Sequence, residues 1–350
     1  MDEASGSGRG SAALRFCHQV LQLEQELDYP PPEDLREAET QSLLYRRLFS
    51  EADDGPCYAP PTRYSVRVLK ELIRRIESSI EDWDTHEVSE DLMGRMAELL
   101  ATPMPSEFDS AQQKSYVTYH LSRIQRDGAP ETEAAITLLE SRSLISASGT
   151  TGLRTWEAAL HLGEYLCSNP HIVRGRNVLE LGAGTGYLAI LCGKFLGAQR
   201  VVASDGSDDV INNLPESLFL NGLQDADRAI TPMELRWGHA LVGTEDREWN
   251  GGEAVDVVLG ADITYDERIL PALVGTLEEL MGMFPGLEVL ISATQRNEAT
   301  FESFQARCRM AGLGLEEVGF GVPVRAAQKG PFYSDAVPIR ICSVRRGETR

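Results

Sequence analysis

The sequence predicts an α/β protein in which a parallel β-sheet, covered by helices on both faces, follows a helical N-terminal extension. Three observations support this prediction. From Asn177 onward, short β-rich runs alternate with helical patterns, as in consecutive β-α-β units. The first of these runs leads directly into Gly182, Gly184 and Gly186. Residues 11–100 instead show apolar side chains at helical spacing.

The extension is expected to form several separate helices. Apolar residues repeat at helical spacing in two series, Phe16–Leu27 and Leu69–Ile80. Proline clusters at 30–32 and 60–61 interrupt the pattern, because proline lacks a backbone N–H and stops a helix. Residues 102–106, which contain two prolines, are typical of a linker.

The linker suggests two domains, an extension over residues 1–110 and a second domain over 111–350. The second domain is expected to begin with a β-hairpin. Its strands are predicted at Tyr116–Leu121 and Ala135–Leu139, with the turn at residues 127–130.

The remaining elements are predicted from periodicity and run length. Strands are expected at Asn177–Leu181, Arg200–Ser204, Met233–Leu235, Val255–Leu259 and Leu287–Ser292. Helices are expected at Trp156–Cys167, Tyr187–Phe195, Asp208–Leu220, Glu267–Met283 and Glu298–Ala311. The last two runs, Leu315–Val322 and Val337–Val344, have no long helix between them, which suggests an antiparallel hairpin at the sheet edge.

The glycine-rich turn after the first parallel strand points to a nucleoside cofactor. Gly182, Gly184 and Gly186 have no Cβ, so a ligand can lie against their backbone at the carboxyl end of the strand. The G-x-G-x-G spacing differs from dinucleotide and P-loop patterns. Glu180, at the strand end, is a candidate for holding a cationic amino group. An ordinary glycine-rich connection is the alternative interpretation.

Acidic residues at two further strand ends strengthen the cofactor interpretation. Asp205 follows the second strand about 20 residues after the glycines, where a carboxylate can accept hydrogen bonds from ribose hydroxyls. Ser207 or Asp208 can cap the next helix and leave Asp205 free. Asp262 and Tyr265 form a D-x-x-Y pattern after the fourth strand, where a substrate would meet the cofactor. Alternatively, Asp262 caps a helix.

Two tryptophans are placed near the same edge of the sheet. Trp156 precedes a helix and Trp237 follows the third strand. Most tryptophans at such positions belong to the core. An indole face can also stack on adenine or pack against a sulfonium cation, a contact of about 0.5–2 kcal/mol.

Composition limits the partners and the location. The formal net charge of −21 disfavours direct nucleic-acid binding and would suit a basic partner, although acidic composition is common among cytosolic proteins. No apolar run approaches the roughly 18 residues of a membrane span, and the first ten residues do not resemble a signal peptide. We therefore expect a cytoplasmic protein that does not bind membranes.

Cysteine and histidine usage gives no support for a disulfide framework or a metal site. The six cysteines are scattered without a C-x-x-C pair, which is typical of reduced thiols. The six histidines form no ligand pattern, so no metal is expected.

Taken in order, these motifs resemble the lysine-specific protein methyltransferases of the class I, seven-strand group. Gly149–Ala159 resembles their G-x-x-x-W-[DE]-A-A segment, and Val178–Gly186 resembles their V-L-E-L-G-x-G-x-G motif. The string at residues 149–156 is most similar to that of the elongation factor 2 lysine methyltransferases of eukaryotes. The resemblance covers about residues 116–345. It implies a Rossmann-like seven-strand methyltransferase sheet and S-adenosyl-L-methionine as cofactor.

The resemblance also implies site residues. The cofactor contacts would fall on Trp156, Gly182, Ala183, Gly184, Asp205, Trp237 and Ala261. Asp262 and Tyr265 would fall on the D-x-x-Y signature and are the expected catalytic residues. One departure is Arg236, since the family often has an acidic residue before its tryptophan.

The implied reaction is methyl transfer to a lysine amine of a protein, with elongation factor 2 as the expected substrate. A lysine with a reference pKa near 10.4 must lose a proton before it attacks. We expect Asp262 to orient the incoming ammonium and Tyr265 to close the pocket. The extension would recognise the protein substrate or, alternatively, simply cover the core.

Three other functions stay open at this stage. The chain could be an inactive cofactor-binding scaffold, although the intact motifs count against that. It could also methylate a small molecule, because a fold alone does not fix the acceptor. A nicotinamide oxidoreductase is disfavoured by the glycine spacing.

Overall fold

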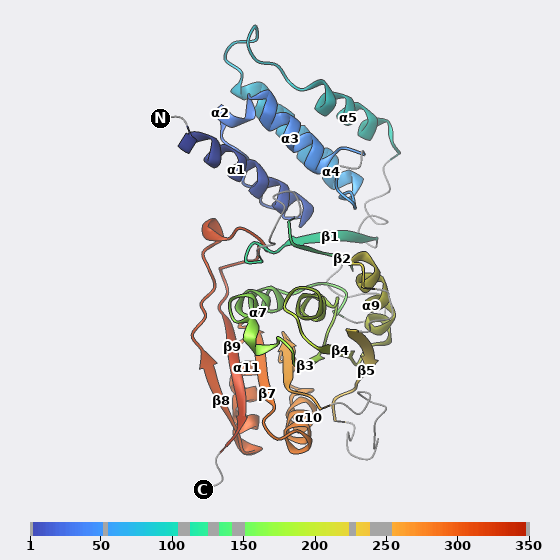
Figure 1. The fold of residues 1–350 in the computed structure, drawn as a ribbon, viewed down its shortest axis with the longest axis vertical. Coiled ribbons are helices and arrows are strands. Elements are labelled where there is room, and N and C mark those ends of the chain that lie inside the picture. The colour runs from blue at the N-terminus through green and yellow to red at the C-terminus, as the bar shows by residue number, and fades with distance from the viewer. Residues whose placement is uncertain are drawn as a thin grey trace.

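A seven-stranded sheet with helices on both faces forms the larger part of the protein (Figure 1). The computed structural model describes residues 3–51, 55–103, 113–124, 133–141, 151–223, 229–238 and 254–347. The expected turn at 127–130, the boundary near residue 110, and Gly149 and Thr150 of the family-like segment lie outside these residues.

The sheet has the strand order β5-β4-β3-β6-β7-β9-β8. Its strands are β3 (Asn177–Leu181), β4 (Arg200–Asp205), β5 (Ile230–Glu234), β6 (Val257–Ala261), β7 (Glu288–Thr294), β8 (Leu313–Val318) and β9 (Ile339–Arg346). The first five are parallel. The chain leaves β3 toward β4 and later returns to its other side as β6, and ligands bind at such a switch point in open α/β sheets. The expected α/β class with a Rossmann-like seven-strand sheet is confirmed.

The last two strands form an antiparallel pair at the sheet edge, as expected. β9 pairs antiparallel with both β7 and β8, so the final strand is internal and β8 forms the edge. The segment between them includes a short 3-10 turn, η3 (Arg325–Ala327). It extends away from the sheet toward the N-terminal helices (Figure 1).

Two layers of helices cover the sheet. One layer contains α7 (Glu157–Ser168), α8 (Tyr187–Ile190) and α9 (Asp208–Leu220), and the other contains α10 (Leu270–Met283) and α11 (Glu298–Met310). Alternate strand residues face the two layers: Val178 packs on the first side and Leu179 on the second. The helix expected over 187–195 changes at Leu191 into a π-helical segment, η2 (Leu191–Phe195).

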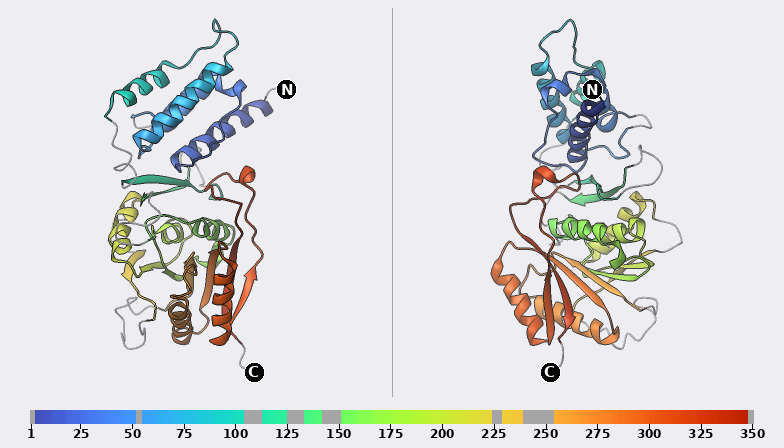
Figure 2. Two further views of the ribbon diagram at one scale, coloured as in Figure 1. Left: turned by 180° about the vertical axis from the view of Figure 1, so that it is seen from behind. Right: turned by 60° about the vertical axis from the view of Figure 1, so that its left-hand side comes forward.

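The N-terminal part of the chain is helical, as its apolar spacing predicts. It contains α1 (Glu3–Leu21), α2 (Pro32–Leu35), α3 (Ala38–Leu48), α4 (Thr62–Ser79) and α5 (Glu90–Ala101). These helices form one end of an elongated molecule, and the C-terminus lies at the other end (Figure 2). No helix among the described ranges is both long and apolar enough to cross a membrane.

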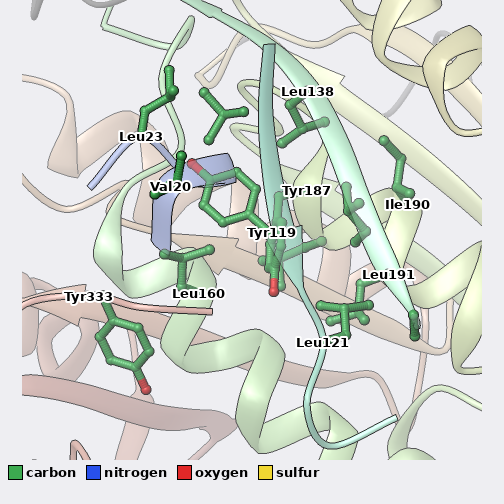
Figure 3. Packing of buried hydrophobic residues seen from close by; sticks show 14 of the residues in the cluster. Val20, Leu23, Tyr119, Leu121, Leu138, Leu160, Tyr187, Ile190, Leu191 and Tyr333 are labelled. Carbon is green, nitrogen blue, oxygen red and sulfur yellow. The ribbon is translucent and has the colours of Figure 1, made fainter. Parts of the chain in front are cut away.

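A two-stranded hairpin lies between the N-terminal helices and the large sheet. Its strands, β1 (Lys114–His120) and β2 (Ala135–Ser141), pair antiparallel. Val20 and Leu23 from the extension lie in one hydrophobic cluster with Tyr119 of β1, Leu160 of α7 and Tyr333 (Figure 3). The extension therefore packs continuously onto the rest of the protein.

The fold brings together two histidines that are far apart in the sequence. The rings of His18 (α1) and His120 (β1) stack with their centroids 3.7 Å apart. His18 Nε2 lies 2.9 Å from a carboxylate oxygen of Glu133, and Arg47 lies 3.3 Å from the same oxygen. The two imidazoles and this carboxylate are within reach of one metal ion, a grouping that the sequence spacing did not reveal.

Candidate active site

A cavity of about 560 Å³ opens at the carboxyl ends of β3, β4, β5 and β6, and we call it the main cavity. Ten of the eleven residues predicted for the site line this cavity. These are Trp156, Glu180, Gly182, Ala183, Gly184, Asp205, Trp237, Ala261, Asp262 and Tyr265. Parallel strands place their carboxyl ends at one edge, so motifs separated along the chain meet there.

The glycine turn approaches its neighbours too closely for side chains. Gly182 and Gly184 have φ values of 68° and 54°, which L-residues rarely adopt. A Cβ on Gly182 would lie 2.7 Å from Cγ2 of Ile263. A Cβ on Gly184 would lie 3.1 Å from the carbonyl oxygen of Gly152. Glycine is therefore required at both positions by the neighbouring chain, and both residues line the main cavity.

Gly186 differs from the prediction, because the structure does not place it on the wall of the main cavity. It is the N-cap residue of α8 with φ 86°, and a Cβ there would lie 2.8 Å from Cδ2 of Leu214. Its glycine is therefore required by the turn and by the packing of α9. The G-x-G-x-G spacing alone does not show which glycines line the cavity and which are needed for packing.

Glu180 presents an unpartnered oxygen at the cavity. Its side chain is buried, and Oε2 has no hydrogen-bond partner among the described residues. Burial raises the pKa of Glu180 well above its ordinary value, and the backbone N–H of Ala189 opposes that change. A buried carboxylate oxygen without a donor fits a cationic ligand group.

Asp205 is fixed by two backbone donors. Its Oδ2 accepts a hydrogen bond from the Gly184 N–H at 3.1 Å, and its Oδ1 accepts one from the Ser207 N–H at 3.0 Å. Burial raises the pKa of this carboxyl group, and these hydrogen bonds oppose the change. Asp205 lines the main cavity, and its carboxylate oxygens can accept further hydrogen bonds from a diol there.

Both tryptophans lie on the cavity wall. Trp156 is the N-cap residue of α7, and its indole N–H donates to the carbonyl of Thr151 at 3.2 Å. The guanidinium of Arg296 lies 4.9 Å from the Trp156 ring centroid, so a cation already occupies one side of this indole. Trp237 lies beside Gly182.

Asp262 is held by the end of β7 and does not cap the next helix, which begins at Leu270. Its Oδ1 accepts from the Thr294 N–H at 2.8 Å, and its Oδ2 accepts from the Thr294 hydroxyl at 2.9 Å. The side chain is 8% exposed, and burial raises its pKa. Tyr265 is 63% exposed at the mouth of the cavity.

Arg296 is a site residue that the sequence interpretation missed. Its guanidinium lies 3.4 Å from Asp262 and 2.5 Å from Glu157, so it connects α7 to the D-x-x-Y segment. The available signal was its position just after β7, since the ends of all parallel strands share one edge.

Comparison with known proteins identifies the family. A family described as lysine methyltransferase matches residues 142–307. The chain is 57% identical over 340 residues to the protein-lysine N-methyltransferase EFM3 of Chaetomium thermophilum, covering 97% of this chain and 99% of that protein. The chain belongs to the protein-lysine N-methyltransferases. It is also 33% identical over 234 residues to EFM3 of Saccharomyces cerevisiae, covering 61% and 66% of the two chains. It is 28% identical over 296 residues to human EEF2KMT, covering 81% of each chain.

The methyltransferase uses S-adenosylmethionine, and the residues of the main cavity fit this cofactor. Glu180 offers an unpartnered carboxylate oxygen for an amino group. Asp205 offers lone pairs for two hydroxyls, and Gly182 and Gly184 line the cavity beside it. The cavity is large enough for a nucleoside-sized ligand.

Proposed function

We propose that this methyltransferase modifies a lysine of elongation factor 2 in the cytoplasm. The observation that carries the proposal is its similarity to human EEF2KMT, which spans 81% of both chains and whose name refers to elongation factor 2. The sequence at residues 149–156, which resembles that of the elongation factor 2 lysine methyltransferases, also supports this substrate. The strongly acidic composition, with a net charge of −21, suits a basic surface on the substrate.

In this proposal, the residues of the main cavity divide into two groups. Glu180, Gly182, Ala183, Gly184, Asp205, Trp237 and Ala261 hold the cofactor, with Trp156 at the border. Asp262 and Tyr265 face the substrate amine. When bound, S-adenosylmethionine supplies the electrophilic methyl group.

The lysine must attack as a neutral amine, and the positive charge of the bound cofactor together with burial favours its deprotonation. Asp262 is held in place by Thr294 and keeps lone pairs that can orient the amine. The guanidinium of Arg296 next to Asp262 partly offsets the carboxylate charge, which would otherwise stabilise the ammonium form of the incoming lysine. Tyr265, at the mouth, can pack against the apolar stem of the lysine.

We also propose that the extension contributes to substrate recognition. A second cavity of about 760 Å³ lies between residues 22–26, the hairpin and residues 332–336. It shares Arg154 and Thr155 with the main cavity. A polypeptide seated beside the extension would therefore be close to the reaction site.

The test is methylation of purified elongation factor 2 with radiolabelled S-adenosylmethionine. Elongation factor 1A serves as the matched protein control, and the Asp262→Ala variant serves as the enzyme control. We expect label on a lysine of elongation factor 2, located by mass spectrometry and absent in both controls. Labelling of a different protein in an extract that lacks this enzyme, with none on elongation factor 2, would overturn the substrate assignment.

A further inference from the structure

A chain of buried hydrogen bonds runs from the hairpin to the glycine turn. Oε1 of Glu140 accepts from the Tyr119 hydroxyl at 2.8 Å and from the Thr155 hydroxyl at 2.6 Å. The Thr155 hydroxyl also lies 2.7 Å from the hydroxyl of Thr185, which stands between Gly184 and Gly186 in the glycine turn. All four side chains are buried.

The chemistry of these groups gives the chain a direction. The hydroxyls of Tyr119 and Thr155 both donate to Oε1 of Glu140, and burial raises the pKa of this carboxyl group. Thr155 has a single hydroxyl proton, and therefore Thr185 must donate to Thr155. The backbone N–H of Thr155 binds the same carboxylate. Without the carboxylate, the Thr155 side chain would no longer be held in one rotamer, and the Thr185 hydroxyl would lose its fixed orientation.

The backbone next to Thr155 is also held by β2, the strand that carries Glu140. The N–H of Ser141, next to Glu140, donates to the carbonyl of Leu153 at 2.8 Å. The carbonyl of Gly152 lies against Gly184 of the turn. Residues 152–155 are thus sandwiched between the end of β2 and the glycine turn.

The opposite side of the turn is held by a different carboxylate. Asp205 accepts the Gly184 N–H from the end of β4. The turn is therefore clamped between Asp205, which faces the main cavity, and Glu140, which does not. Glu140 instead lines the second cavity, and its hydrogen bonds reach the main cavity through Thr155 and Thr185, both of which line it.

We propose that Glu140 is a positioning residue that fixes the Thr155–Thr185 pair and so preorganises the glycine turn for S-adenosylmethionine. Nothing in this proposal depends on which protein is the substrate. It assigns a function to the hairpin, because β2 carries the carboxylate on which the cofactor turn rests. Preorganised turns bind ligands more tightly, since less ordering is needed on binding.

The test compares S-adenosylmethionine binding, by titration calorimetry, among variants of the full-length protein. Thr185→Val removes the hydroxyl and keeps the shape, and Glu140→Gln removes the carboxylate. We expect Kd to rise about fivefold to thirtyfold in both, the range that follows from one lost buried hydrogen bond. Thr185→Ser, which keeps the hydroxyl, should stay within about twofold of the wild type.

Two controls separate positioning from general stability. Thr118 and Thr137 form a hydroxyl pair at 2.9 Å on the same hairpin and line neither cavity, so Thr137→Val should leave Kd unchanged. Leu72→Ala in α4 should lower the melting temperature without changing Kd. An unchanged Kd in Glu140→Gln or in Thr185→Val would overturn the proposal, as would an equal rise in Leu72→Ala.

Discussion

Gly182 and Asp262 both have left-handed backbone conformations, and both lie on the main cavity. Their φ values are 68° and 52°. For glycine this conformation costs little, whereas for aspartate it must be held by its surroundings. Asp262 is held by its N–H to the Ser292 carbonyl at 2.8 Å and by both carboxylate bonds to Thr294. The site therefore depends on tertiary support at this residue.

Replacing Gly182 by alanine should abolish tight cofactor binding. The new Cβ would lie 2.7 Å from Cγ2 of Ile263, and the alanine would have to adopt a positive φ. Gly175→Ala is the matched control, because Gly175 has the same φ of 68° with open space around it. The control should lose only about 1–2 kcal/mol of stability. Calorimetry and chemical denaturation measure both, and equal effects of the two variants would contradict the steric argument.

Asp262→Asn should slow methyl transfer about a hundredfold while leaving cofactor binding within about threefold. The amide still fits between Thr294 and the cavity, but it lacks the negative charge that orients the amine. Single-turnover kinetics with bound cofactor measures the chemical step directly. If Asp262→Asn and Tyr265→Ala both kept wild-type turnover, the catalytic roles proposed for these residues would be wrong.

At the scale of elements, α1 and the hairpin meet at a titratable contact. The pKa of His120 is lowered to about 4, first by burial and then by His18, while Glu133 acts in the opposite direction. The pKa of Glu133 is lowered to about 2, chiefly by its hydrogen bond from His18. Arg47 adds positive charge beside both groups. This contact should therefore weaken in acid.

The direction of the pH effect on stability follows from proton binding to His120. The unfolded chain protonates His120 near pH 6.5, whereas the folded protein does so only near pH 4, so stability should fall as the pH drops between these values. His120→Asn should flatten this decline, whereas His171→Asn, at an exposed position, should not. Urea midpoints measured from pH 7 to 5 provide the test. Parallel curves for wild type and His120→Asn would refute it.

At the scale of the whole molecule, the extension and the catalytic sheet share one hydrophobic core. Val20 and Leu23 are almost completely buried against residues of β1, α7 and the C-terminal segment (Figure 3). Arg325 reaches back to Glu24 in an ion pair of 2.8 Å. The extension therefore covers the core, whatever it adds to substrate recognition.

Deleting residues 1–110 should leave a fragment that aggregates, because the deletion exposes this shared core to water. Size-exclusion chromatography and thermal unfolding of the fragment measure the outcome. A soluble fragment that unfolds cooperatively and binds S-adenosylmethionine would contradict this expectation. Such a fragment would leave substrate docking as the main role of the extension.

The sequence predicted most elements because their signals are local. The period of apolar residues located α4 and α9, and the glycine turn after β3 marked the cofactor edge of the sheet. The order of β8 and β9 was less accessible, since pairing with β7 is decided by packing between distant segments. The π-helical turn at Leu191 carries no local pattern either.

The chain by itself determined the fold class, the cofactor and most of the cavity wall, because strand ends in a parallel sheet converge on one edge. Tertiary structure alone decided three other features. It turned Gly186 away from the cavity, brought Arg296 to Asp262, and connected Glu140 to the glycine turn. Each depends on side chains far apart in sequence, and their distances are set by packing rather than by any local spacing.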